Sequence, residues 1–114
     1  MENEITINGT VYIAKKKASR NYYIVRTNKA GVFAGEIKEK DLEKGIVVMN
    51  NARRLWYWDG AASLSQLAME GVSKPENCQF PCEVNEVTLL GVVEIIPCTE
   101  IAQKSIEKVE IWKK

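Results

Sequence analysis

The run of residues 53–58 gathers the side chains of this chain that are best suited to bind a nucleotide-like anion. It reads Arg-Arg-Leu-Trp-Tyr-Trp, ends in an Asp-Gly turn signal and is followed by a stretch of small residues. A guanidinium can fork onto a phosphate, an indole can stack on a base, and backbone N–H groups at the start of a helix face anions. We therefore predict a ligand-binding pocket built from Arg53, Arg54, Trp56, Trp58, Ala62 and Ser63.

The same residues also suit an ordinary core. If residues 53–58 form a strand, Arg53, Leu55 and Tyr57 share one face, and Arg54, Trp56 and Trp58 share the other. One face must then meet the core, so at most one arginine faces a ligand. In the structural alternative the tryptophans are buried and Arg54 pairs with Asp59. Asp59 is the main difficulty for the pocket, because a carboxylate there repels phosphate.

Residue types that are absent or scarce limit the chemistry. The chain has no histidine, which excludes a histidine general base and histidine–metal catalysis, and no pair of carboxylates stands out. The three cysteines, Cys78, Cys82 and Cys98, form no Cys-x-x-Cys pair and are expected to be free thiols. We predict a protein that is not an enzyme and uses neither a metal nor a cofactor.

Charge is divided unevenly along the chain. Residues 11–54 carry a net charge of +7 and residues 59–100 a net charge of −6, within a total of +1. This division favours a positive surface that attracts an anion. Equally, the two halves can interleave and pair their charges, or form complementary faces of a homo-oligomer.

A basic strip near the N-terminus supports a second interpretation, nucleic-acid binding. Its members are Lys15, Lys16, Lys17, Arg20 and Arg26. Tyr22 lies among them and could stack on a base. A pI near 7.6 argues against a dedicated nucleic-acid protein, and a lysine run is more often a solvated loop. Binding of a host protein through exposed tryptophans is a further alternative.

Hydrophobic alternation in the first half predicts short strands joined by turns. The expected strands are 4–7, 10–13, 22–27, 32–37, 46–49 and 53–58. Asn8-Gly9 is a hairpin turn signal, and Lys29–Gly31 and Asn50-Asn51 are expected to be turns. We expect a basic loop over 15–21 and a charged surface turn over 38–44.

The second half predicts two helices around further strands. Residues 61–70 have helical spacing, with Asp59 as N-cap and Gly71 as the stop. Residues 72–81 are expected to be a loop. The β-rich stretch 84–96 is interrupted at Gly91 and ended by Pro97. Thr99 caps the second helix, whose inner face is formed by Ile101, Ala102, Ser105, Ile106 and Val109.

These elements predict an α+β fold, an antiparallel β-meander with two short helices packed on one side. At 114 residues, with no linker or repeat, the chain is expected to be a single domain over 1–114, closed by an edge strand at 109–112. No apolar run reaches the length that a bilayer needs, and residues 1–4 lack a signal-peptide pattern, so we expect a cytoplasmic protein without a membrane partner.

Residues 52–71 resemble a family of small proteins encoded by tailed phages and prophages. The same resemblance extends to Lys74–Cys78, Glu94–Thr99, Ile5–Gly9 and Tyr23–Thr27, and so covers nearly the whole chain. The family carries a label of unknown function and implies no site residues. It implies a viral context, in which small proteins without catalytic motifs often bind host factors, nucleic acid or nucleotide signals of host defence. Our leading hypothesis is a phage-encoded sponge for such a signal.

Overall fold

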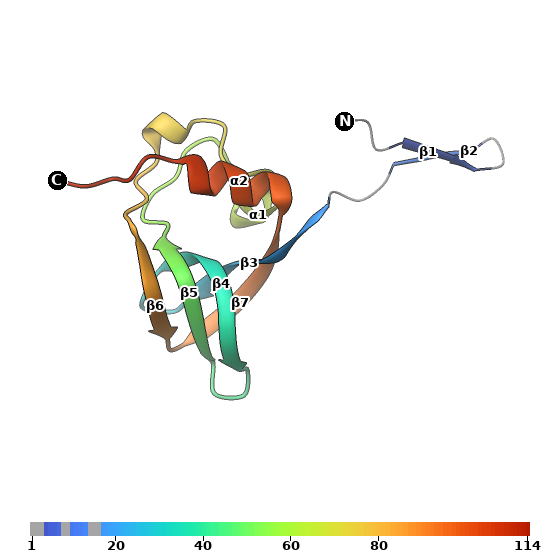
Figure 1. Cartoon of the computed structure of the whole chain (residues 1–114). Coiled ribbons are helices and arrows are strands. Elements are labelled where there is room, and N and C mark those ends of the chain that lie inside the picture. The colour runs from blue at the N-terminus through green and yellow to red at the C-terminus, as the bar shows by residue number, and fades with distance from the viewer. Residues whose placement is uncertain (1–3, 8–9, 14–16) are drawn as a thin grey trace.

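The computed structural model describes residues 4–7, 10–13 and 17–114, with side chains from Lys17 onward. The predicted α+β class is confirmed (Figure 1). The strands are β1 (Glu4–Ile7), β2 (Thr10–Ile13), β3 (Ala18–Thr27), β4 (Val32–Asp41), β5 (Ile46–Arg54), β6 (Glu83–Leu89) and β7 (Val92–Thr99). The helices are α1 (Leu64–Glu70), the 3-10 helix η1 (Pro75–Asn77) and α2 (Glu100–Lys108).

An antiparallel five-stranded sheet of order β6-β5-β4-β3-β7 forms the body of the protein. Strands β3 to β6 follow one another as the predicted meander, and β7 returns to pair with β3. The two edge strands, β6 and β7, are joined by Leu90 and Gly91 alone, so the sheet must curl until its edges approach each other (Figure 1). Strands β1 and β2 pair with each other in a separate two-stranded sheet.

The curled sheet buries a core on each of its faces. Neighbouring residues divide between the faces, as alternation requires: Ile24 joins the cluster beneath the helices, and Val25 joins the cluster formed by strand residues alone. Leu67, Ala102 and Ile106 close the first cluster from α1 and α2. Both helices lie together at one end of the sheet, as predicted, and the β4–β5 turn lies at the other (Figure 1).

Side-chain caps fix where the helices begin. Thr99 caps α2 as predicted, its Oγ1 accepting from the Ala102 N–H at 3.0 Å. Gly71 ends α1 as predicted, with φ at 78°. The predicted N-cap Asp59 is wrong, because Ser63 caps α1 and the helix starts at Leu64.

The prediction of a turn at Asn50-Asn51 is also wrong. Strand β5 runs continuously from Ile46 to Arg54, and Asn51 takes a positive φ of 49° inside it. The ladder with β4 shifts register there, as in a β-bulge. Gly35 lies against the bulge, where a Cβ would come within 2.8 Å of the Ala52 Cα. The expected strand over 53–58 is wrong beyond Arg54, where β5 ends, and Tyr57 makes only an isolated bridge to Gln79.

Several other boundaries differ from the predictions. Strand β3 begins at Ala18, inside the expected basic loop, and β4 continues to Asp41, inside the expected charged turn. Pro97 lies within β7, which is an edge strand and so tolerates it. The expected strand at 109–112 is reduced to a bridge between Ile111 and Phe80.

One residue of α2 does not lie on the face that was expected. Ile101, expected on the inner face of α2, is 60% exposed, whereas Ala102 and Ile106 are fully buried. The predicted Asn8-Gly9 turn lies outside the described residues. Neither α-helix of the described part of the chain has the length and apolar character needed to cross a bilayer.

Candidate functional site

Arg53 is buried beneath α2 and holds three backbone carbonyls. Only 3% of the residue is exposed to solvent. Nε donates to Pro81 O at 2.8 Å, Nη1 to Ile106 O at 2.9 Å and Nη2 to Phe80 O at 2.9 Å. The guanidinium carbon also lies 5.5 Å from the centre of the Phe80 ring. Arg53 thus joins β5, the segment before β6 and the C-terminal turn of α2.

This environment fits a structural cation. Burial lowers the pKa of Arg53, yet arginine stays charged in proteins. The Ile106 carbonyl belongs to the last turn of α2, where a positive charge is favourable. Three of the five N–H donors of Arg53 are bonded to backbone carbonyls, and the residue is buried and does not line the hollow described below.

Arg54 lies on the opposite face of β5 and is exposed. Its guanidinium carbon lies 4.3 Å from the centre of the Phe33 ring, and Nη1 donates to the Ala30 carbonyl. Within the part of the chain that the structure describes, this is the one hydrogen bond of the Arg54 side chain. The stack on buried Phe33 therefore orients the guanidinium and leaves donors for another acceptor.

A surface hollow of about 390 Å³ lies beside Arg54. Its lining residues are Lys29, Ala30, Gly31, Val32, Arg54, Leu55, Trp56 and Trp58. Trp56 is 65% exposed, whereas Trp58 is partly buried against the core beneath the helices. The neighbouring Tyr57 is 52% exposed and does not line the hollow. The hollow thus combines two cations and two indoles, and none of its lining residues is acidic.

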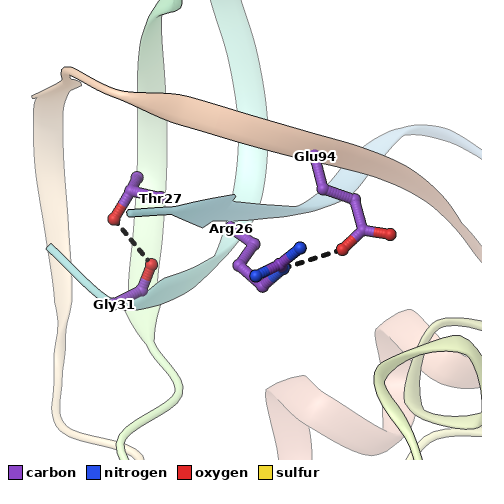
Figure 2. Close-up of polar contacts among 4 residues, drawn as sticks. All are labelled: Arg26, Thr27, Gly31 and Glu94. Atoms are coloured by element: carbon purple, nitrogen blue, oxygen red, sulfur yellow. Dashed lines mark hydrogen bonds and ion pairs between the residues drawn. The ribbon is translucent and has the colours of Figure 1, made fainter. Parts of the chain in front are cut away.

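The turn between β3 and β4 forms one wall of the hollow and is tightly bonded. Thr27 donates from Oγ1 to the Gly31 carbonyl at 2.9 Å, as Figure 2 shows, and its N–H bonds the same oxygen at 2.9 Å. The Ala30 N–H donates to Thr27 Oγ1 at 2.8 Å. This wall is preorganised by its own backbone.

Lys29 contributes a positive charge to the hollow, but the sequence analysis did not include it among the predicted ligand-binding residues. A signal for it existed. In an antiparallel meander the start of one strand lies beside the end of the next, and here Phe33 pairs with Arg54. A turn that immediately precedes β4 therefore belongs next to residues 54–58.

Ala62 and Ser63 do not join this hollow. The Ala62 N–H donates to Gln66 Oε1 at 2.8 Å, and Ser63 Oγ accepts from the Gln66 N–H at 3.1 Å. These bonds satisfy donors at the start of α1 within the helix itself. Of the predicted site residues, the structure brings together Arg54, Trp56 and Trp58.

Asp59 is held away from Arg54. Its Oδ2 accepts from Asn77 Nδ2 at 2.9 Å, and this hydrogen bond lowers the pKa of the carboxyl group. The Asp59 N–H lies 3.5 Å from Cys78 Sγ. Asp59 therefore ties residues 59–60 to the η1 region and does not line the hollow.

Ion pairs connect the basic and acidic halves of the chain. The pairs among the described residues are Lys17–Glu100 at 3.6 Å, Arg26–Glu94 at 2.8 Å and Lys38–Glu86 at 3.0 Å. Each joins a base from 11–54 to an acid from 59–100, so the halves do interleave. Figure 2 shows Arg26, from the predicted basic strip, directed at Glu94. Arg20 is exposed, whereas Lys15 and Lys16 lie outside the described residues.

The cysteines are free thiols, as predicted. Cys78 and Cys98 are buried, and burial raises the pKa of Cys98 to about 12. Among the described residues no group of three or more cysteine, aspartate or glutamate side chains is placed to hold a metal ion.

Comparison with known proteins gives the chain a family. A family model described as a domain of unknown function, DUF6948, matches residues 20–106, from near the start of β3 to the last turn of α2. No curated protein and no solved structure matches the chain. The matched region contains the whole hollow and the buried Arg53. The chain therefore belongs to the DUF6948 family of domains of unknown function.

Proposed function

We propose that this domain is a non-catalytic binding protein for a small nucleotide-like anion. The observation that carries the proposal is the hollow in which Arg54 and Lys29 accompany Trp56 and Trp58. Cationic donors suit a phosphate, and an exposed indole suits the face of a base. Arg53 has no place in this site, because it is buried, does not line the hollow and donates to the Pro81, Ile106 and Phe80 carbonyls.

The side chains that line the hollow support an acceptor-rich ligand. Those with polar groups are Lys29, Arg54, Trp56 and Trp58, and each of them only donates hydrogen bonds. An anion with several acceptor oxygens complements such a set. Asp59 does not line the hollow, and its carboxylate accepts a hydrogen bond from Asn77.

In the phage context that the sequence resemblance implies, the proposed role is sequestration of a nucleotide-type signal of host defence. Such a sponge would act in the cytoplasm of the infected or lysogenic cell, and a homo-oligomer could present several hollows. Sequestration requires only that the ligand stays bound, without any catalytic step.

A thermal-shift screen tests the proposal. The probes are mononucleotides, cyclic di- and trinucleotides and ADP-ribose isomers, each in large excess. A ligand at 100 times its Kd stabilises the folded state by about 2.7 kcal/mol, which is several degrees in melting temperature. No shift with any probe would contradict the proposal.

Two matched pairs of variants locate the binding site. Trp56→Ala should clearly reduce the shift, whereas Tyr57→Ala should not, although both side chains are more than half exposed. Arg54→Ala should likewise reduce it, with Arg26→Ala as the control at another exposed arginine. Circular dichroism establishes that each variant is folded.

The exposure of Trp56 and Tyr57 supports docking of a host protein as a second function. Exposed aromatic side chains are frequent anchors of protein interfaces. A protein partner would contact both neighbours, so Trp56→Ala and Tyr57→Ala should then weaken binding alike. Nucleic-acid binding has less support, because Lys17 and Arg26 of the basic strip are ion-paired.

A further inference from the structure

We infer that the hollow recognises a nucleotide by its phosphate and by the face of its base, and does not read the identity of the base. This inference rests on the proposed function and names the ligand class: nucleoside phosphates of any base. It follows from which hydrogen-bonding groups the hollow offers, and which of them the protein already uses.

The backbone acceptors on one wall already accept hydrogen bonds from the protein. The Ala30 carbonyl accepts from Arg54 Nη1, and the Gly31 carbonyl accepts from both the N–H and the Oγ1 of Thr27. The Val32 carbonyl accepts from the Leu55 N–H at 2.8 Å. Three consecutive carbonyls of this wall are thus engaged within the protein.

The lining side chains supply no acceptor to replace them. Lysine, arginine and tryptophan side chains donate only, and the other lining side chains are apolar or absent. The edges of adenine, guanine and cytosine carry an amino group that needs an acceptor. No lining side chain can accept from that group, and we place the donors of Lys29 and Arg54 on the phosphate, so the edge of the base is left toward water.

The face of a base, by contrast, has a partner. Trp56 exposes 65% of its surface and lines the hollow together with the cation of Arg54. Every base has a π-face, and stacking on an aromatic side chain is therefore tolerant of base identity. The volume of about 390 Å³ lies near the lower end of the range for small-molecule sites, roughly 300–1,000 Å³. It suits a single nucleotide unit.

Calorimetric titration of the full chain with AMP, GMP, CMP and UMP, and with ribose 5-phosphate, tests the inference. The four nucleotides should bind with Kd values within about 10-fold of one another. Ribose 5-phosphate lacks the stacking face and should bind about 5- to 150-fold more weakly. Trp56→Ala should weaken the nucleotides to the level of ribose 5-phosphate, Trp56→Phe should restore most of the affinity, and Tyr57→Ala should change nothing.

The outcomes separate this inference from the proposed function. One nucleotide binding more than about 30-fold tighter than the other three would overturn base tolerance and leave nucleotide binding intact. Ribose 5-phosphate binding as tightly as the nucleotides would overturn the stacking role of Trp56. No binding by any of the four nucleotides would overturn this inference, and a shift in the wider thermal screen would show whether the proposed function survives.

Discussion

Arg53 and Arg54 are adjacent in the chain, yet their surroundings differ in almost every respect. Arg53 is 3% exposed and donates to three carbonyls, whereas Arg54 is exposed and donates to one. Both lie near a phenylalanine ring, Phe80 for one and Phe33 for the other. Strand alternation separates them, and each face then gives its arginine a different set of partners.

The difference extends to the two sides of the sheet. On the side of Arg53, α1 and α2 cover a large core that includes Tyr22 and Cys98. On the side of Arg54, the curled sheet encloses a smaller core of strand residues. The hollow lies where the two cores meet, because its lining includes Ala30, which packs on the smaller core, and Leu55 and Trp58 of the larger one. Arg53 thus supports the fold beneath the helices, whereas Arg54 lines the hollow in which we place binding.

Replacing each arginine by methionine should show the difference between the two residues most clearly. Arg53→Met removes three hydrogen bonds from a charged donor, but only the Pro81 carbonyl loses its sole donor, because the Phe80 and Ile106 carbonyls still accept from the Trp112 and Val109 N–H groups. The unfolding free energy should therefore fall by roughly 3–6 kcal/mol. Arg54→Met removes one exposed hydrogen bond and a cation–π contact, and should cost about 1 kcal/mol. Urea unfolding followed by circular dichroism measures both.

A milder variant covers the case in which Arg53→Met does not fold. Arg53→Lys keeps the charge but cannot reach three carbonyls from one rigid fork, so it should lie between the wild type and Arg53→Met. Equal losses for the Arg53 and Arg54 variants would contradict the assignment of opposite roles.

The role of each arginine could not be predicted from the sequence, although much around them could. Alternation correctly placed Arg53 and Arg54 on different faces. It could not say which face is buried, because that depends on the Ile106 carbonyl, 53 positions away in the chain. Local patterns carry no information on such a contact.

At Thr99 and Gly71, where short-range chemistry decides, the predictions were confirmed. Thr99 caps α2 because its hydroxyl bonds an N–H three residues on, and Gly71 ends α1 because its φ is positive. The predicted turn at Asn50-Asn51 was wrong because a positive φ at an asparagine fits a turn and a β-bulge equally well. Only the neighbouring strand, with Gly35 against the bulge, distinguishes the two.

Replacing Gly71 or Gly31 by alanine should show a similar contrast between the helix packing and the surroundings of Arg54. Gly71 and Gly31 both have positive φ, 78° and 89°. A Cβ at Gly71 would meet Ser105 Cβ at 2.3 Å, where α1 packs on α2, whereas at Gly31 the nearest group is Arg54 Nη1 at 3.6 Å. Both variants carry a backbone cost of about 1–2 kcal/mol, and Gly71→Ala adds about 1–3 kcal/mol of overpacking. Thermal unfolding should rank Gly71→Ala below Gly31→Ala, and the reverse order would contradict the packing argument.

Alkaline pH should destabilise the protein through the helix-covered side. Burial raises the pKa of Cys98 from 9.0 to about 12 and raises the pKa of Tyr22 above its ordinary value of 10.0. Between pH 9 and pH 12 the unfolded thiol loses its proton before the folded one, so stability is present below pH 9 and declines as pH rises. The decline should approach about 1.4 kcal/mol per pH unit for each group.

Tyr22→Phe separates the two contributions. Tyr22 is 3% exposed, and its hydroxyl has no hydrogen-bond partner among the described residues. The variant should therefore be at least as stable as the wild type at pH 7, and its stability should decline less steeply above pH 10. An unchanged slope in urea titrations at pH 9 to 11 would assign the alkaline loss to other groups.

The smallest expected effect belongs to a third arginine, Arg26, whose partner is a carboxylate at the surface. The Arg26 and Glu94 side chains are 50% and 41% exposed, and the pair joins β3 to β7 at 2.8 Å (Figure 2). Exposed ion pairs contribute about 0.2–1 kcal/mol and are screened by salt. A double-mutant cycle of Arg26→Ala and Glu94→Ala should give a coupling energy in that range at low salt and close to zero in 1 M NaCl. A coupling as large as the loss in Arg53→Met would mean that ion pairing matters here as much as burial. The prediction instead is that an arginine stabilises this fold in proportion to the buried carbonyls it satisfies.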